Sequence, residues 1–151
     1  MTKILFVCHG NICRSPMAEF VMKKLVKEAG MEKDFEIRSA ATSREEIGNP
    51  VYPPARRKLA EHGMSCSGKY AVQMTAADYD RYEYIVIMDR NNERNIRRII
   101  KNDPDGKVRL LMEYAGVKRD VADPWYTGDF ETTYRDVDEG CRALLKYILH
   151  Q

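Results

Sequence analysis

Cys8 and Arg14 are separated by five residues, and Ser15 and Pro16 follow directly. A cysteine thiolate is a strong nucleophile, and a guanidinium group can donate two parallel hydrogen bonds to an oxyanion such as phosphate. When the backbone between two such residues curves, its N–H groups converge on the same anion. The spacing therefore predicts a phosphate-binding loop with Cys8 at its floor and Arg14 beside the phosphate.

The residues on either side of this loop strengthen the prediction. The loop follows the apolar run 4–7, which is typical of a strand buried on both faces, and it precedes a helical pattern whose N-terminus is partly positive. Gly10 and Asn11 tolerate the positive φ angles that such a loop requires. This setting favours the thiolate form of Cys8. A cysteine followed six positions later by an arginine also occurs by chance, and in that interpretation Cys8 is simply a buried residue.

Strands and helices alternate along the chain. Apolar runs predict strands at 4–7, 35–38, 84–88 and 108–111. Helical spacing predicts helices over 16–29, 54–62, 90–101 and 134–148, with Asp89 capping the third, and residues 120–129 are predicted to form a loop. This alternation predicts an α/β fold, a four-stranded parallel sheet with helices on both faces and the phosphate-binding loop after the first strand. Ligands of such sheets bind beyond the carboxyl ends of the strands, and Cys8 stands at one of these ends.

The composition is that of an ordinary globular domain. The chain has 151 residues, of which 44% are hydrophobic and 32% charged, and 25 basic against 23 acidic side chains leave a net charge of +2. We expect one domain over residues 1–151, no nucleic-acid partner, no membrane span and no signal peptide, and therefore a cytoplasmic protein. The cysteines lack the spacing of zinc ligands, so we expect free thiols and no metal.

Asp123 is the candidate for a general acid. Expelling the oxygen of a phosphate monoester is difficult, and a group that protonates this oxygen contributes roughly 10²–10⁴-fold in rate. Asp123-Pro124 also fits an ordinary turn, which is our interpretation of Asp103-Pro104. The difference is the aromatic pair Trp125-Tyr126, which is suited to form the wall of a slot for a flat ring.

Three stretches together resemble the low-molecular-weight protein tyrosine phosphatase family: residues 8–19 (CHGNICRSPMAE), 39–43 (SAATS) and 123–126 (DPWY). The resemblance spans essentially the whole chain, and the first stretch is highly specific. It implies an enzyme without metal or cofactor whose substrate is a phosphotyrosine-containing protein, and we expect a monomer. It also implies that Cys8 forms a cysteinyl-phosphate, that Arg14 binds the phosphate, and that Asp123 protonates the leaving tyrosine and then activates water.

The resemblance assigns supporting roles to further polar residues. The phosphate-binding loop itself comprises His9, Gly10, Asn11, Ile12, Cys13 and Ser15. Ser15 either donates a hydrogen bond to the Cys8 sulfur or caps the following helix. Asn11, Ser39 and His62 resemble the buried network that holds the loop in shape, although His62 alone is more simply interpreted as a residue at the end of a helix.

Cys13 has two interpretations. It is either a small buried residue or, as in the family, a redox partner that captures oxidised Cys8 as a disulfide. Cys66 and Cys141 are expected to be structural.

The substrate slot is expected to include Glu45, Trp125 and Tyr126. Relatives specific for phosphoarginine carry threonine in place of Ile12, so the apolar Ile12 favours phosphotyrosine. Residues 44–46 (REE) are charged near the place where the eukaryotic pattern has an aromatic residue, and they form either one wall of the slot or a solvated loop. His9 also departs from the residues usual at its place.

Three other functions remain open at this point. Phosphoarginine phosphatase and arsenate reductase use the same fold and loop, and a non-catalytic phosphopeptide-binding module is the third alternative. Arsenate reductases need additional, closely spaced cysteines near the middle of the chain, where only Cys66 lies. A binding module is expected to have lost its nucleophile or its acid, whereas Cys8, Arg14 and Asp123 are all present.

Overall fold

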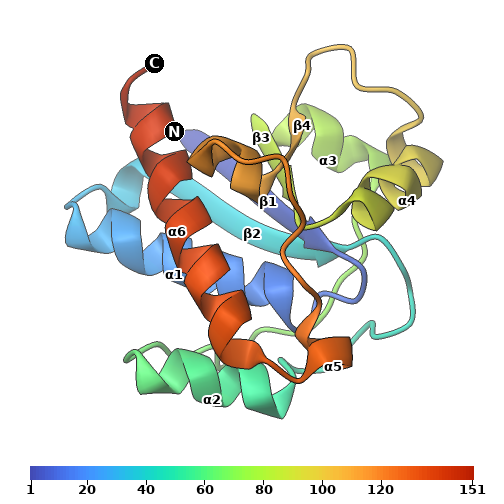
Figure 1. Ribbon diagram of the computed structural model, residues 1–151. Coiled ribbons are helices and arrows are strands. Elements are labelled where there is room, and N and C mark those ends of the chain that lie inside the picture. The colour runs from blue at the N-terminus through green and yellow to red at the C-terminus, as the bar shows by residue number, and fades with distance from the viewer.

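A sheet of four parallel strands forms the centre of the protein (Figure 1). The computed structural model describes residues 1–151. The strands are β1 (Thr2–Cys8), β2 (Phe35–Ala41), β3 (Tyr84–Ile87) and β4 (Val108–Leu110), in the spatial order β2-β1-β3-β4. All neighbouring strands run parallel. The predicted sheet is therefore confirmed, with small differences at the strand ends.

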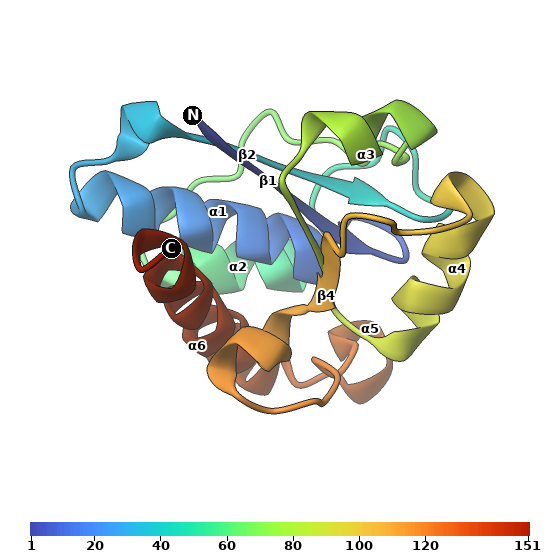
Figure 2. The same cartoon turned by 90° about the horizontal axis from the view of Figure 1, so that it is seen from above.

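Helices cover both faces of this sheet, as Figures 1 and 2 show. They are α1 (Arg14–Glu28), α2 (Pro53–Glu61), α3 (Ala76–Arg81), α4 (Arg90–Ile100), α5 (Pro124–Thr127) and α6 (Phe130–Leu149), with short 3₁₀ helices at Glu32–Asp34 and Leu111–Ala115. The larger buried cluster joins one face of the sheet to α1, α2 and α6, and the smaller one joins the other face to α3 and α4. The four predicted helices are thus confirmed. None of the helices carries an apolar stretch long enough to cross a bilayer.

The first strand explains why both faces are covered. Successive side chains of a strand point to opposite faces, so Ile4 and Phe6 lie in the larger cluster and Leu5 and Val7 lie in the smaller one. All four side chains are almost fully buried. Burying each of them contributes about 1.5–3 kcal/mol, so β1 is firmly anchored and holds its last residue, Cys8, in a fixed position.

Two helices lie where no helix is predicted from the sequence. The predicted loop 120–129 contains α5, because Pro124 suits a first helical turn and the Asp123 carboxylate accepts a hydrogen bond from a backbone N–H of that turn. The start of α3 is a capping box formed by Thr75 and Asp78. Both helices are too short to show a helical period, which explains why the pattern of apolar residues does not reveal them.

Candidate active site

A pocket of about 170 Å³ opens at the carboxyl edge of the sheet, where ligands of parallel α/β sheets bind. Its lining comes from the loop after β1, the loop after β2 and the segment around the start of α5. The lining residues are Cys8, His9, Gly10, Ile12, Cys13, Arg14, Glu45, Glu46, Asp123, Trp125 and Tyr126. The fold thus brings the predicted catalytic residues and the predicted slot residues together around one opening.

The backbone of the loop after β1 is shaped to hold an anion. None of the N–H groups of residues 9–13 donates a hydrogen bond to another protein atom, so these donors are available to a ligand. Asn11 has a φ of 60°, in the left-handed region expected for it. Gly10, by contrast, does not adopt a positive φ. A Cβ atom on Gly10 would lie 3.3 Å from Cγ of Glu46, so glycine leaves room for the close approach of two loops.

The Cys8 sulfur lies at the bottom of the pocket and has one side-chain partner. Its Sγ atom is 2.9 Å from Oγ of Ser15, in the first turn of α1. The N-cap residue of this helix is Cys13, and no side chain makes a cap hydrogen bond. Of the two roles open to Ser15, the structure therefore supports the contact with sulfur. The helix N-terminus and the N–H groups of the loop both favour negative charge at this position.

Three partners hold the Arg14 side chain in place. Nη1 donates hydrogen bonds to Oδ2 of Asp89 at 2.7 Å and to the carbonyl oxygen of Val121 at 2.8 Å, and Nη2 lies 3.4 Å from Oδ2 of Asp123. Burial acts to lower the pKa of the Arg14 guanidinium, but the negative charges of Cys8, Asp89 and Asp123 outweigh burial and raise this pKa. The group is therefore charged and oriented, as a phosphate ligand requires.

Asp89 is a site residue that the sequence does not reveal. Its predicted role as the N-cap of α4 is confirmed, because Oδ1 accepts a hydrogen bond from the Asn92 N–H at 2.8 Å. The second oxygen, Oδ2, binds Arg14. Capping is visible in the local sequence, whereas the contact with a residue 75 positions away depends on β1 and β3 being neighbours in the sheet.

The Asp123 carboxylate lies within reach of a ligand on the loop. Its Oδ1 accepts a hydrogen bond from the Trp125 N–H at 3.0 Å, which fixes the side chain at the start of α5. Its Oδ2 faces Arg14. A carboxylate in this position can exchange a proton with the bound ligand or with water. Asp103, in the other Asp-Pro pair, accepts hydrogen bonds from the hydroxyl of Tyr79 and from two backbone N–H groups instead, which confirms that it belongs to a structural turn.

A chain of buried hydrogen bonds supports the loop from below. The side-chain Nδ2 of Asn11 donates to Oγ of Ser15 at 2.8 Å and to Oγ of Ser39 at 2.9 Å. The hydroxyl of Ser39 donates in turn to Oε1 of Glu19 at 2.5 Å. Asn11 and Ser39 therefore lie in the supporting network, and Glu19 extends it in a way that the sequence does not indicate.

His62 does not join this network, and the simpler interpretation holds, because it is the residue at the C-terminal end of α2. Its ring stacks on Tyr134 of α6, with 4.0 Å between the ring centroids. Lys69 lies beneath the loop instead: its Nζ donates to the carbonyl oxygen of Ser39 at 2.9 Å and lies 3.6 Å from Oε1 of Glu19. Nothing in the local sequence of the α2–α3 loop marks Lys69 for this position, because its partners belong to β2 and α1.

All four cysteines are buried and free. Burial, reinforced by the negative charges of Cys8 and Asp123, raises the pKa of Cys13 from 9.0 to about 12. Burial also raises the pKa values of Cys66 and Cys141, and neither of these residues lines the pocket. No group of three or more His, Cys, Asp or Glu side chains is placed to hold a metal ion.

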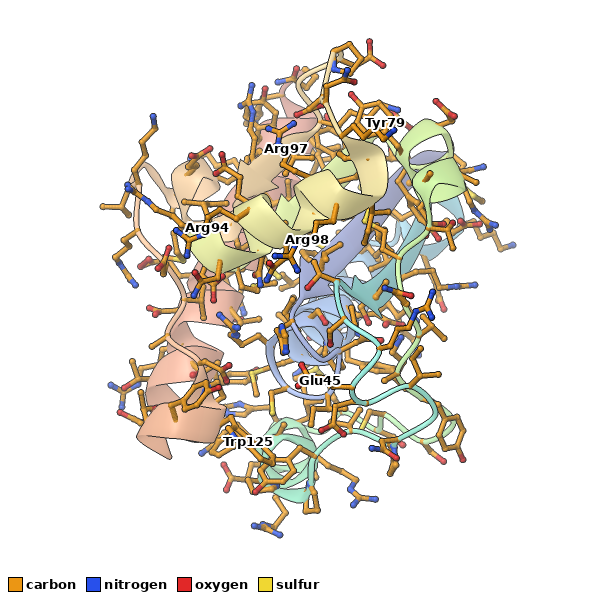
Figure 3. All side chains as sticks on the ribbon, turned by 90° about the vertical axis from the view of Figure 1, so that its right-hand side faces the viewer. Glu45, Tyr79, Arg94, Arg97, Arg98 and Trp125 are labelled. Carbon is orange, nitrogen blue, oxygen red and sulfur yellow. The ribbon has the colours of Figure 1, made fainter.

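Exposed side chains surround the opening of the pocket. His9 Nε2 contacts Oε2 of Glu45, so the loop after β1 and the loop after β2 are linked at the opening. Trp125 packs against Tyr52 with ring centroids 4.8 Å apart, and Tyr126 is 85% exposed. Figure 3 shows Glu45 and Trp125 on the same face of the molecule. The opening therefore offers both aromatic and acidic side chains to a ligand.

The fold and the pocket lead to an enzyme family. The family model described as low molecular weight phosphotyrosine protein phosphatase matches residues 3–151. The chain is 36% identical over 150 residues to the low molecular weight protein-tyrosine-phosphatase YfkJ of Bacillus subtilis, with 98% of this chain and 96% of that relative covered. The chain therefore belongs to the low-molecular-weight phosphotyrosine protein phosphatases, as the three sequence motifs indicate.

Solved structures lead to the same conclusion. The crystal structure of YfkJ from Bacillus subtilis superposes with a TM-score of 0.95 and covers 99% of this chain and 96% of its own. The low molecular weight protein tyrosine phosphatase SP-PTP of Streptococcus pyogenes is 40% identical, with a TM-score of 0.87 and coverages of 97% and 93%. An arginine phosphatase of Drosophila is 29% identical, with a TM-score of 0.87 and coverages of 97% and 98%. The protein thus has both the fold and the sequence of a phosphatase.

Proposed function

We propose that this protein hydrolyses phosphotyrosine in protein substrates through a cysteinyl-phosphate intermediate. In the first step the Cys8 sulfur attacks phosphorus, the bond between phosphorus and the tyrosine oxygen breaks, and Asp123 donates a proton to that oxygen. In the second step Asp123 accepts a proton from water, the water oxygen bonds to phosphorus, and the Cys8 thiolate leaves. The products are the dephosphorylated tyrosine side chain of the substrate protein and inorganic phosphate.

In this mechanism the loop after β1 stabilises the transferring phosphoryl group in both steps. Its N–H groups and Arg14 donate hydrogen bonds to the equatorial oxygens, which carry the negative charge in the transition state. Arg14 needs little rearrangement for this task, because Asp89 and Val121 already hold its side chain. Every group in the scheme belongs to one chain, so a monomer is sufficient for activity.

The proposal rests mainly on the groups that surround the Cys8 sulfur. This sulfur lies 2.9 Å from Oγ of Ser15, beside N–H groups that have no protein partner, and it shares its pocket with Arg14 and Asp123. A cysteine that only fills the core needs none of these groups. A module that only binds phosphopeptides needs the N–H groups and the arginine, but neither the nucleophile nor the acid.

A phosphotyrosine suits the pocket because Ile12, Trp125 and Tyr126 offer apolar surface to its flat ring. Phosphoarginine is the second candidate substrate, since the arginine phosphatase of Drosophila shares the fold and acidic Glu45 and Glu46 line the pocket. Matched peptides that carry phosphotyrosine or phosphoarginine at the same position distinguish the two. We expect a higher kcat/KM for phosphotyrosine, and the reverse order would overturn this assignment.

We extend the proposal to Cys13 as a redox partner of Cys8. Hydrogen peroxide oxidises the Cys8 thiolate to a sulfenic acid, which condenses with the Cys13 thiol to form a disulfide and release water. Both residues line the same pocket, and thiol reductants of the cytoplasm would restore the two thiols. After peroxide treatment, we expect dithiothreitol to restore the activity of the wild type but not that of Cys13→Ser.

Hydrolysis of para-nitrophenyl phosphate tests the proposed function. We expect turnover by the wild type, and a loss on the order of 10⁴-fold or more in Cys8→Ser, because the serine hydroxyl is not ionised at neutral pH and the nucleophile is lost. The matched control is Cys66→Ser, which alters a buried cysteine outside the pocket and is expected to keep activity. Full activity of Cys8→Ser would exclude the mechanism.

A further inference from the structure

A buried group of charges lies beneath the phosphate-binding loop, outside the pocket lining. Its centre is the Glu19 carboxylate on α1, which is 3% exposed. Oε2 of Glu19 accepts a hydrogen bond from Nζ of Lys23 at 2.5 Å, whereas Oε1 accepts the hydroxyl of Ser39 at 2.5 Å and lies 3.6 Å from Nζ of Lys69. Buried charges are costly unless they are paired and hydrogen-bonded, and two lysines pair with the buried Glu19 carboxylate.

Lys69 is the more buried of the two lysines. Its side chain is 12% exposed, against 37% for Lys23, and its ammonium group donates a hydrogen bond to the carbonyl oxygen of Ser39. Burial lowers the pKa of Lys69, and the neighbouring charges of Glu19 and Cys8 oppose this shift. Lys69 therefore interacts electrostatically with the carboxylate beneath the loop and with the sulfur above it.

The carboxylate determines the direction of the hydrogen bond that it forms with Ser39. An ionised carboxylate only accepts hydrogen bonds, so the Ser39 hydroxyl must donate to Glu19. The lone pairs of Ser39 are then free to accept a hydrogen bond from Asn11 Nδ2. The orientation of the Asn11 amide is fixed independently, because its Oδ1 accepts the Val72 N–H at 3.2 Å.

On its other side, Asn11 donates toward the nucleophile. The Asn11 Nδ2 group also donates to Oγ of Ser15. The only remaining neighbour for the Ser15 hydroxyl hydrogen among these groups is the Cys8 sulfur, at 2.9 Å. Ser15 is therefore the donor and Cys8 the acceptor, which is the arrangement that stabilises a thiolate both before attack and when it leaves phosphorus.

We propose that Glu19 and Lys69 are positioning residues that act through Ser39, Asn11 and Ser15 to stabilise the Cys8 thiolate. The inference rests on the proposed function, since it assigns these residues to the same nucleophile. Loss of Lys69 leaves the buried Glu19 carboxylate with one lysine, Lys23, and removes a positive charge from beneath the sulfur. Ser39 then loses the lysine that binds its carbonyl oxygen, and the hydrogen bond to Ser39 that helps to hold the Asn11 amide against Ser15 is weakened.

The experiment compares four variants with the wild type. Lys69→Met removes the charge at similar length, and Lys69→Arg restores it. The double variant Glu19→Leu/Lys69→Met removes the pair without changing the net charge, and replacement of a buried pair by apolar residues is often compatible with folding. Lys24→Met is the matched control, because Lys24 also lies on α1 but binds the carbonyl oxygen of His62.

The primary measurement is the pH dependence of Cys8 alkylation by iodoacetamide, with competition by inorganic phosphate and mass spectrometry to identify the modified residue. We expect alkylation at pH 6 to slow by about 3- to 10-fold in Lys69→Met and in the double variant, because the thiolate is the reactive form. The midpoint of the alkylation profile should move to higher pH. Lys69→Arg should return to within about twofold of the wild type because it restores the charge, and Lys24→Met should not change.

Steady-state kinetics with para-nitrophenyl phosphate provide the second readout. We expect kcat to fall by about 3- to 10-fold with a KM change below about twofold, because a less stable thiolate is a poorer leaving group in the second step while the phosphate ligands are untouched. A residue that only maintains the fold would lower the melting temperature without shifting the alkylation midpoint. We therefore measure thermal unfolding of every variant.

The following results would overturn either the role of Glu19 and Lys69 or the proposed function. A wild-type alkylation profile in the folded double variant overturns it, even when Lys69→Met alone fails to fold. A shift in Lys24→Met equal to that in Lys69→Met also overturns it, because the effect would then follow surface charge in general. If the wild type alkylates as described but does not hydrolyse the substrate, the proposed function fails while the role of Glu19 and Lys69 in stabilising the thiolate stands.

Discussion

The floor of the pocket is buried and its side chains have fixed partners, whereas the side chains around its opening are exposed to solvent. The floor consists of Cys8 and Arg14, supported by Ser15 behind the sulfur, and the rim consists of His9, Glu45, Trp125 and Tyr126. No floor residue is more than 3% exposed, and each makes a hydrogen bond within the protein. Two of the rim residues, Trp125 and Tyr126, are 53% and 85% exposed.

This difference separates the chemistry from the choice of substrate. Buried dipoles and charges that are already oriented stabilise a transition state without reorganising, so substitutions at the floor are expected to remove turnover. An exposed polar contact such as His9–Glu45 contributes little energy in water, and an exposed aromatic ring gains contacts only when a ligand covers it. Substitutions at the rim are therefore expected to change KM by modest factors.

The largest effect below Cys8→Ser is expected for Asp123→Asn, since Asp123 joins the floor to the rim. An amide keeps the hydrogen-bond acceptor for the Trp125 N–H but cannot deliver a proton, so kcat for phosphotyrosine peptides should fall roughly 10²–10⁴-fold. The matched control is Asp103→Asn in the other Asp-Pro pair, which should lower the melting temperature and leave kcat within about twofold. Equal losses of kcat in both variants would show that Asp123 is not a specific acid.

The next largest effect is expected in the alkylation rates of two thiols of similar burial, Cys8 and Cys13. With a pKa near 12, Cys13 is ionised in about one molecule in 10⁵ at pH 7. Mass mapping after limited iodoacetamide treatment at pH 7 should find Cys8 modified at least about 100-fold faster than Cys13, because thiolate is the reactive form. In denaturant the two rates should become similar. Equal rates in the folded protein would contradict the contrast between the two environments.

The same raised pKa has a consequence for stability. The folded state keeps the Cys13 proton up to pH 12, whereas the unfolded chain releases it near 9.0. The contribution of this buried thiol is therefore fully present below pH 9 and declines as the pH rises from 9 toward 12. Urea unfolding at pH 7 and pH 10 should show a smaller alkaline loss of the free energy of unfolding in Cys13→Ala than in the wild type.

The smallest effect is expected at the rim. Trp125→Ala should raise KM for a phosphotyrosine peptide by about 3- to 10-fold, because aromatic contacts of this kind contribute about 0.5–1.5 kcal/mol, and kcat should change little. Trp125→Phe should retain most of the affinity. Inhibition by inorganic phosphate, which contacts only the floor, should be the same in all three proteins. A large loss of kcat in Trp125→Ala would instead place this residue in the chemistry.

Several features of the fold and the site could be predicted because their signals are local. Buried strands appear as short apolar runs, and a loop between such a run and a helix shows its nucleophile, its arginine and its left-handed residue within seven positions. The helices α3 and α5 carry no such signal, because they are too short to show a helical period of apolar residues. The φ angle of Gly10 is not positive, contrary to the prediction, and its close neighbour is Glu46 on another loop.

The amino-acid order alone established the α/β class, the phosphate-binding loop and the identity of Cys8, Arg14 and Asp123 as candidates, because residue type and spacing within one segment are sufficient for these inferences. Only the folded chain revealed that Asp89 holds Arg14 and that Lys69, rather than His62, lies beneath the loop. Such contacts depend on strand order and on the packing of α1 against β2. They join residues tens of positions apart, and no pattern within a single segment records which distant segment will lie beside it.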